Sequence, residues 1–110
     1  MRILALERDL NGPVRPDLHD ILRAEAASVW DLQKRGILRN IWFTVPGRRA
    51  ILMLECSGVT EAKGHLDKLP LVSHGLCTFE VLELSSYDGF ERLFGAGLTP
   101  AHKSEEPPEY

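Results

Sequence analysis

The sequence predicts an α+β protein of the ferredoxin-like type, with the element order βαββαβ and a four-stranded antiparallel sheet. Two patterns predict this order. A run without glycine or proline separates the first strand candidate from the second, and a shorter run with helical spacing separates the third from the fourth. The chain has 110 residues, of which 44% are apolar and 26% are charged. This length and composition predict one domain.

The first half of the chain predicts a strand followed by a long helix. Residues 2–8 are apolar at four positions and then end in charged residues. The sequence Asn11-Gly12-Pro13 indicates a turn, and Pro16 suits the first turn of a helix. We expect this helix to run from Pro16 to about Arg35, because Gly36 can adopt the left-handed conformation that ends helices.

The second half predicts a hairpin, a second helix and a last strand. Residues 37–45 and 50–56 are rich in strand-forming residues, and Pro46-Gly47 between them indicates an antiparallel turn. Ser57 can cap a short helix that Pro70 ends. Its inward positions follow helical spacing: Val59, Ala62, Leu66 and Leu69. Residues 77–84 predict the fourth strand, and residues 87–94 predict one or two helical turns.

The domain is expected to span residues 1–95, and its sheet is expected to need a cover on both faces. In the third strand, Leu52 and Leu54 point one way while Ile51 and Met53 point the other. Leaving such a face in water costs about 25 cal/mol per Å² of apolar surface. We therefore predict a symmetric homodimer whose sheets face each other, the dimeric α/β barrel. Residues 96–110 are polar and proline-rich, which predicts a disordered tail.

Charge, cysteine content and spacing argue against several classes of partner. The net charge is −3 and the isoelectric point is near 5.8, so neither nucleic acid nor an anionic membrane is expected as a partner. The sequence shows no signal peptide and no membrane span, which predicts a cytoplasmic protein. Cys56 and Cys77 are expected to be reduced core thiols. No metal-ligand spacing or glycine-rich phosphate loop is present, so no cofactor is expected.

One acidic residue interrupts the apolar stripe of the first predicted helix. With 3.6 residues per turn, the stripe consists of Leu18, Leu22, Glu25, Val29 and Leu32. Glu25 is therefore expected to face the sheet, where burial would raise its pKa and make it a usable acid and base near neutral pH. The alternative places Glu25 at the margin of the stripe, in water or paired with Arg39 or Arg49.

Other polar or aromatic side chains could join Glu25. Strand alternation places Asn40 and Trp42 on one face of the second strand, and Phe43 on the other. If the face with Asn40 meets the helices, Asn40 could orient a substrate oxygen and Trp42 could form an apolar wall. The alternative is a tryptophan in a subunit interface. His74 lies in an irregular segment and could reach the mouth of a pocket, or could be a surface histidine.

Three features of the sequence resemble the muconolactone isomerase-like group of dimeric α/β barrel proteins. They are Glu25 eleven positions before Gly36, the Ile41-Trp42 pair, and Leu69-Pro70-Leu71 leading to Phe79-Glu80-Val81. The segment Tyr87-Asp88-Gly89-Phe90 is also similar to that of many uncharacterised bacterial relatives. The resemblance covers residues 1–95 and implies the ferredoxin-like fold.

The resemblance also implies an activity and a set of site residues. It implies that Glu25 carries a proton across an unsaturated lactone and that the segment with Asn40, Trp42 and Phe43 contacts the substrate. Where the isomerase has His-Ile-Trp-Arg, this chain has Asn40-Ile41-Trp42-Phe43, which removes two groups that could engage a substrate carboxylate. A more apolar carbonyl compound or lactone is therefore expected.

Three functions remain open at this stage. The first is a cofactor-independent isomerase or cyclase in which Glu25 moves a proton, Asn40 or His74 polarises a carbonyl, and Trp42 lines the pocket. The second is a non-catalytic dimeric binding or accessory protein that holds a small hydrophobic ligand in the same cavity. The third is a cofactor-free monooxygenase, for which Trp42 and His74 are the motivation.

Overall fold

The structure confirms the α+β arrangement and the predicted order of the main elements. It is a computed structural model that describes residues 1–95, and the predicted tail, residues 96–110, lies outside the described residues. The strands are β1 (Arg2–Asp9), β2 (Leu38–Phe43), β3 (Ala50–Glu55) and β4 (Cys77–Glu83). The helices are α1 (Leu18–Lys34), α2 (Val59–Asp67), α3 (Pro70–Ser73) and α4 (Glu91–Phe94).

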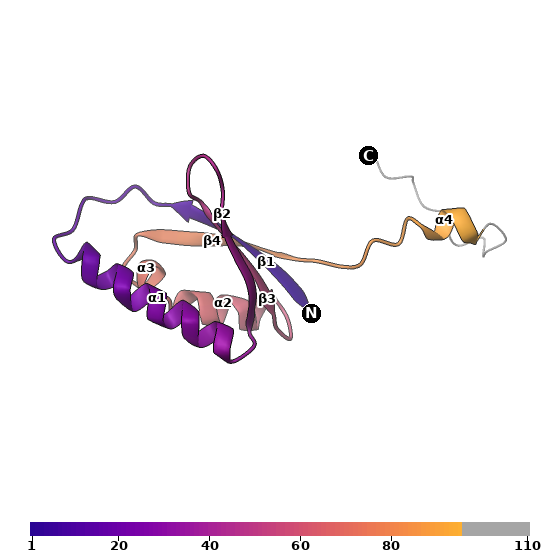
Figure 1. The fold of residues 1–110 in the computed structure, drawn as a ribbon, viewed down its shortest axis with the longest axis horizontal. Helices are drawn as coiled ribbons and strands as arrows, with labels where there is room; N and C mark the ends of the chain where they lie inside the picture. The colour runs from indigo at the N-terminus through magenta and orange to yellow at the C-terminus, as the bar shows by residue number, and fades with distance from the viewer. Residues whose placement is uncertain (96–110) are drawn as a thin grey trace.

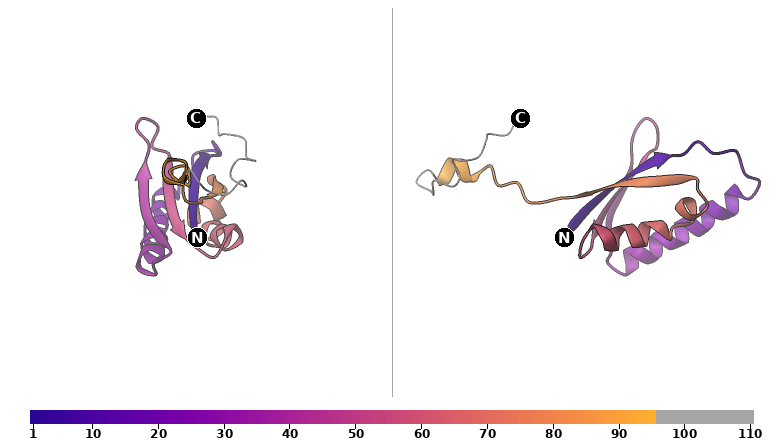
Figure 2. Two further views of the ribbon diagram at one scale, coloured as in Figure 1. Left: turned by 90° about the vertical axis from the view of Figure 1, so that its right-hand side faces the viewer. Right: turned by 180° about the vertical axis from the view of Figure 1, so that it is seen from behind.

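The four strands form one antiparallel sheet in the order β2-β3-β1-β4. The strands of each βαβ unit are therefore separated by one strand of the other unit, as the split arrangement requires. Strand β3 lies between β1 and β2, and β1 lies between β3 and β4. Helices α1 and α2 lie on the same side of the sheet (Figure 1). The opposite side carries no helix among the described residues, so one face of the sheet is open (Figure 2).

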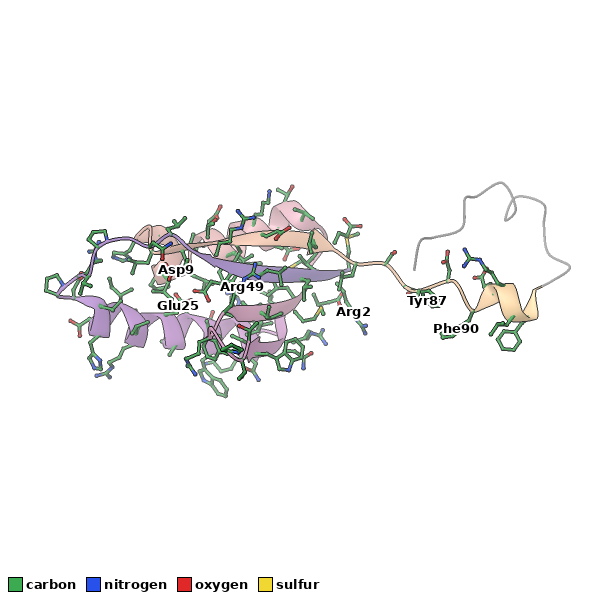
Figure 3. All side chains as sticks on the ribbon, turned by 90° about the horizontal axis from the view of Figure 1, so that it is seen from above. Arg2, Asp9, Glu25, Arg49, Tyr87 and Phe90 are labelled. Atoms are coloured by element: carbon green, nitrogen blue, oxygen red, sulfur yellow. The ribbon has the colours of Figure 1, made fainter. Side chains whose placement is uncertain are left out.

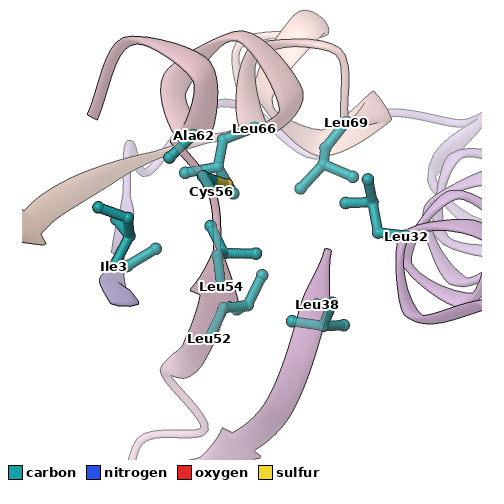
Figure 4. Packing of buried hydrophobic residues seen from close by; sticks show 10 residues of the cluster. Ile3, Leu32, Leu38, Leu52, Leu54, Cys56, Ala62, Leu66 and Leu69 are labelled. Carbon is teal, nitrogen blue, oxygen red and sulfur yellow. The ribbon is translucent and has the colours of Figure 1, made fainter. Parts of the chain in front are cut away.

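The hydrophobic core fills the space between the sheet and the helices. Figure 4 shows side chains from β1, β3, α1 and α2 converging there. The residues of this core are Ile3, Ala5, Leu32, Leu38, Leu52, Leu54, Cys56, Ala62, Leu66 and Leu69. In β1 and β3 the buried residues alternate with less buried ones, which is the period expected for strands covered on one face.

The helix boundaries follow local backbone chemistry. Gly36 ends α1 in the left-handed conformation, with a φ of 78°. At the start of α2, the backbone N–H and the hydroxyl of Ser57 both donate to Glu61 Oε1, at 2.8 and 2.7 Å. Pro70 follows the end of α2, as predicted, and also begins the short helix α3, which the sequence did not predict.

An irregularity in β2 decides which of its faces meets the helices. The register of β2 against β3 shifts between Leu38 and Asn40, as at a β-bulge. After the shift, Ile41 and Phe43 pair with residues of β3 that face the helices, whereas Asn40 and Trp42 pair with residues that face outward. Asn40 and Trp42 thus share one face and Phe43 lies on the other, as strand alternation predicts, but the face with Asn40 does not meet the helices, because the bulge inserts one residue after Leu38.

The open face of the sheet and the segment after β4 both expose apolar side chains. The outward residues of the four strands include Leu4, Leu6, Trp42, Ile51, Met53 and Leu82. After β4 the chain runs away from the body of the domain to α4 (Figure 1). We call residues 84–95 the arm; its exposed apolar side chains are Leu84, Tyr87, Phe90, Leu93 and Phe94.

Among residues 1–95, every helix is too short or too polar to cross a membrane.

Replacing a fully buried core residue should destabilise the domain strongly. Leu54 is 0% exposed, so we expect Leu54→Ala to lower the free energy of unfolding by about 2–5 kcal/mol through lost burial and a residual cavity. Val14 is 92% exposed, and Val14→Ala should change the free energy by less than about 0.5 kcal/mol. Urea denaturation of both variants measures the difference, and equal stabilities would contradict this account of the core.

Candidate functional site

A cavity with a volume of about 270 Å³ lies between α1, α3 and the helix-facing side of the sheet. Most of its wall is apolar, which is typical of sites for small organic ligands. The lining residues are Glu7, Leu22, Glu25, Ala26, Val29, Ile41, Phe43, Ala50, Leu52, Leu71, Cys77 and Phe79. Two carboxylates and one thiol are thus the polar side chains of an otherwise hydrophobic wall.

Glu25 lies in this wall, on the side of α1 that faces the strands (Figure 3). The side chain is half-buried, and its Oε1 accepts a hydrogen bond of 2.9 Å from the backbone N–H of Leu71. Burial is the main cause that raises the pKa of Glu25; the negative charge of Glu7 also raises it, and the Leu71 hydrogen bond acts in the opposite direction. The result is a carboxyl group that holds its proton to higher pH than an exposed glutamate.

The alternative partners considered for Glu25 are engaged elsewhere. Arg39 Nε donates to the backbone carbonyl of Gly36 at 2.7 Å. Arg49 Nε donates to the backbone carbonyl of Glu7, on the neighbouring strand β1. The hydrogen-bond partner that Glu25 does have is a backbone amide, which leaves its charge without a cationic counterpart in the cavity.

Glu7 is a cavity residue that the sequence reading missed. It accepts a hydrogen bond of 2.7 Å from the backbone N–H of Ala50 through Oε1. A signal for it was present, because Ile3, Ala5 and Glu7 alternate along β1 and the first two are completely buried. Extending this alternation by one step places Glu7 on the face that Glu25 approaches from the helix layer.

Cys77 is the third polar group of the cavity. Its thiol is buried, and burial together with the charges of Glu7 and Glu25 raises its pKa to about 12. A thiol with this pKa is protonated at neutral pH and is a poor nucleophile. The thiol is a weak S–H donor, and Glu7 is its hydrogen-bond partner in the cavity wall.

Phe43 lies in the wall of the cavity and meets a cation at its edge. The guanidinium carbon of Arg48 lies 4.2 Å from the centroid of the Phe43 ring, within cation–π range. Arg48 and Arg49 belong to the hairpin between β2 and β3, where a second pocket of about 430 Å³ also includes Glu7. The two pockets therefore share Glu7 as part of their walls.

Asn40, Trp42 and His74, three of the predicted site residues, do not line this cavity. Asn40 and Trp42 lie on the outward face of β2, across the sheet from Glu25. His74 follows α3 and is exposed, and its Nδ1 lies 2.8 Å from the carbonyl oxygen of Pro70. Within one chain, the predicted set is thus divided: Glu25 and Phe43 share a cavity, and the other three lie outside it.

In the part of the chain that the structure describes, no group of three or more histidine, cysteine, aspartate or glutamate side chains could hold a metal ion.

The comparisons with known proteins identify the fold. No protein-family profile matches the chain, and no curated protein matches its sequence. The structure is similar to that of muconolactone isomerase, with a TM-score of 0.68 and 20% identity over 80% of this chain and 92% of the isomerase chain.

A second solved structure has the same fold. It is the 5-chloro-2-hydroxyhydroquinone dehydrochlorinase of Burkholderia phenoliruptrix in complex with 2,5-dihydroxybenzoquinone. The TM-score is 0.59, with 16% identity over 81% of this chain and 98% of that chain. The chain therefore has a muconolactone isomerase-like fold, as its sequence motifs predicted.

Removing the charge of Glu25 should stabilise the fold in a pH-dependent way. Because the pKa of Glu25 is higher in the folded than in the unfolded chain, the unfolded chain loses this proton first as the pH rises, and stability falls across that interval. Glu25→Gln keeps an oxygen acceptor for the Leu71 amide but carries no charge. We expect its melting temperature to exceed that of the wild type at about pH 8, and the gain to vanish near about pH 3.5.

Glu83→Gln serves as the matched control, since Glu83 is an exposed glutamate at the end of β4. It should not reproduce the gain. Thermal denaturation at both pH values makes the comparison, and a Glu25→Gln variant that is less stable at the higher pH would contradict the assigned burial.

Proposed function

We propose that the protein is a cofactor-independent isomerase or cyclase that moves a proton on a small lactone or unsaturated carbonyl compound, with Glu25 as acid and base. The observation that supports this proposal is a half-buried carboxyl group with a raised pKa in the wall of an apolar cavity. Groups tuned toward neutral pH are suited to both taking up and returning a proton.

The cavity supports a reaction in which a carbonyl compound loses and regains a proton. Glu25 as carboxylate takes a proton from the carbon α to the carbonyl, and the electron pair of that C–H bond moves into an enolate. Return of a proton at another carbon of the conjugated system completes the isomerisation. The Leu71 N–H fixes one oxygen of Glu25 during these steps, and the Cys77 S–H is a neutral donor in the same wall.

The placement of the other predicted residues changes their proposed roles. Asn40 and His74 lie outside the cavity of their own chain, so neither is proposed to polarise the substrate carbonyl. Phe43 keeps its proposed role in substrate contact, because it lines the cavity beside Glu25. The monooxygenase alternative loses its motivation, since it depended on Trp42 and His74 near a bound substrate.

A non-catalytic binding protein remains the second candidate, because a small apolar cavity also suits a hydrophobic ligand that is not converted. The two functions differ in what they predict for a bound unsaturated lactone. Catalysis requires conversion of the ligand, and binding alone requires only a saturable affinity.

Isomerisation of α-angelica lactone to its conjugated isomer provides a direct assay. We expect the wild type to accelerate this conversion and Glu25→Gln to lower the rate by about 10²–10⁴-fold, the usual contribution of a positioned acid–base group. Glu83→Gln should leave the rate unchanged. Saturable binding without conversion by the wild type would favour the binding protein, and full activity of Glu25→Gln would refute the role of Glu25.

We also propose that the protein self-associates as a dimer in which the open sheet faces meet. Trp42 and Leu82 on that face are 50% and 39% exposed in the single chain. In the arm, Phe90 and Phe94 are 64% and 84% exposed. Apolar patches of this kind usually mark an interface, and a second copy of the chain offers complementary apolar surface for both. Trp42 then takes the interface role considered in the sequence analysis.

Sedimentation velocity tests this assembly. Met53 lies on the open face of the central strand β3, so Met53→Glu should place a charge in the interface and shift the protein from dimer to monomer. Val14→Glu, in an exposed loop, should leave the dimer intact. A wild-type monomer at micromolar concentration would contradict the proposed dimer.

A further inference from the structure

A second carboxylate enters the cavity from the wall opposite α1. Glu25 comes from the helix layer and Glu7 from strand β1, and both line the same apolar space. The two groups are close enough to interact electrostatically, because the charge of Glu7 contributes to the raised pKa of Glu25. Both charges also act on the thiol of Cys77. The two acids therefore line one small volume from different layers of the fold.

Each carboxylate accepts a hydrogen bond from a backbone amide, and Glu7 also has a hydrogen bond with the Cys77 thiol. Glu7 Oε1 accepts from the Ala50 N–H at 2.7 Å, and Glu25 Oε1 accepts from the Leu71 N–H at 2.9 Å. A carboxylate has about four acceptor sites, so each group keeps acceptor capacity for a substrate hydrogen. Arg49 contributes to the position of Glu7 by donating to its backbone carbonyl, which ties β1 to the start of β3 at this residue.

We infer that Glu7 is a second acid–base group of this cavity, so that the proton taken from the substrate and the proton delivered to the product pass through different carboxylates. This inference rests on the proposed function, because it assigns a further residue to the same reaction. It replaces a shuttle by one carboxylate with a transfer between two.

This proton transfer needs no reactant other than the substrate, the two carboxyl groups and water. The Glu7 carboxylate takes the proton α to the carbonyl, and the electron pair of the broken C–H bond moves through the conjugated system onto the carbonyl oxygen as a dienolate. The protonated Glu25 gives its proton to the distant carbon, where the new C–H bond forms and the dienolate collapses to the carbonyl. Glu7 is then protonated and Glu25 ionised, and proton exchange with water restores the starting state.

The electrostatics of the cavity favour Glu25 as the proton donor and Glu7 as the proton acceptor. Burial raises the pKa of Glu25 and so favours its protonated form relative to an exposed glutamate, which suits it to the role of proton donor. The negative charge of Glu7 also raises the pKa of Glu25. The proposed transfer requires one carboxylate and one protonated carboxyl group in the same cavity, and both acids line that cavity.

Partial reactions separate the two carboxylates experimentally. In D₂O, the α hydrogens of α-angelica lactone exchange with solvent if a base removes them, even when the isomerisation cannot be completed. We expect Glu25→Gln to retain α exchange while losing conversion by about 10²-fold or more, and Glu7→Gln to lose both exchange and conversion to a similar extent. Proton NMR follows both processes in one sample, with Glu83→Gln and a sample without protein as controls.

The outcomes distinguish this inference from the proposed function. If Glu25→Gln loses exchange as completely as conversion, or if Glu7→Gln keeps both, Glu7 is not the base. The inference is then overturned, and the role proposed for Glu25 is unaffected. A wild type that neither exchanges nor converts the lactone defeats the proposed function instead.

A titration without substrate then decides whether the two carboxylates act on each other. In ¹³C NMR, Glu7→Gln should lower the titration midpoint of the Glu25 carboxyl, because a negative charge that raises its pKa has been removed. Glu83→Gln should leave that midpoint in place. An unchanged midpoint in Glu7→Gln overturns the inference, whatever the lactone does.

Discussion

The hydrogen bond from the Leu71 amide to Glu25 Oε1 links α3 to α1 across the cavity. It gives the buried carboxylate a fixed orientation without neutralising its charge, because a backbone amide carries a dipole and no formal charge. An arginine at the same place would stabilise the ionised form strongly and make the group a poor proton donor. The site therefore depends on a polar contact strong enough to position Glu25 and weak enough to leave its pKa raised.

The position of that amide follows from the chain's local chemistry. Leu69 is extended and completely enclosed by the core, and Pro70 begins a new helical turn directly after it. A residue in the first turn of a helix has a backbone N–H without a partner within that helix. Leu71 is such a residue, and Glu25 supplies the missing acceptor. The two features thus satisfy each other: the helix start needs an acceptor, and the carboxylate needs a donor.

Most of the fold could be predicted from the sequence, and about half of the site. Periodicity located the four strands, the two main helices and the inward orientation of Glu25, because these depend on patterns within single elements. Which face of β2 meets the helices could not be predicted, since the bulge after Leu38 depends on pairing with β3. The alternation of Ile3 and Ala5 along β1 also indicates an inward position for Glu7. A charged residue at that point is equally typical of the end of a strand, so the pattern alone did not identify Glu7.

The two faces of the sheet differ in how well they are covered. The helix layer encloses a core and a cavity, whereas the open sheet face and the arm leave aromatic and aliphatic side chains in water. Both the cavity and the open face lie on the same strands, with alternate residues serving each. Substitutions on the outward residues of β2 and β3 should therefore affect assembly first and the cavity only through the sheet.

The most direct test of the central claim is the ¹³C NMR titration of Glu25 in the wild-type protein. A midpoint above that of an exposed glutamate is expected, and a midpoint at or below the ordinary value would contradict the burial of Glu25.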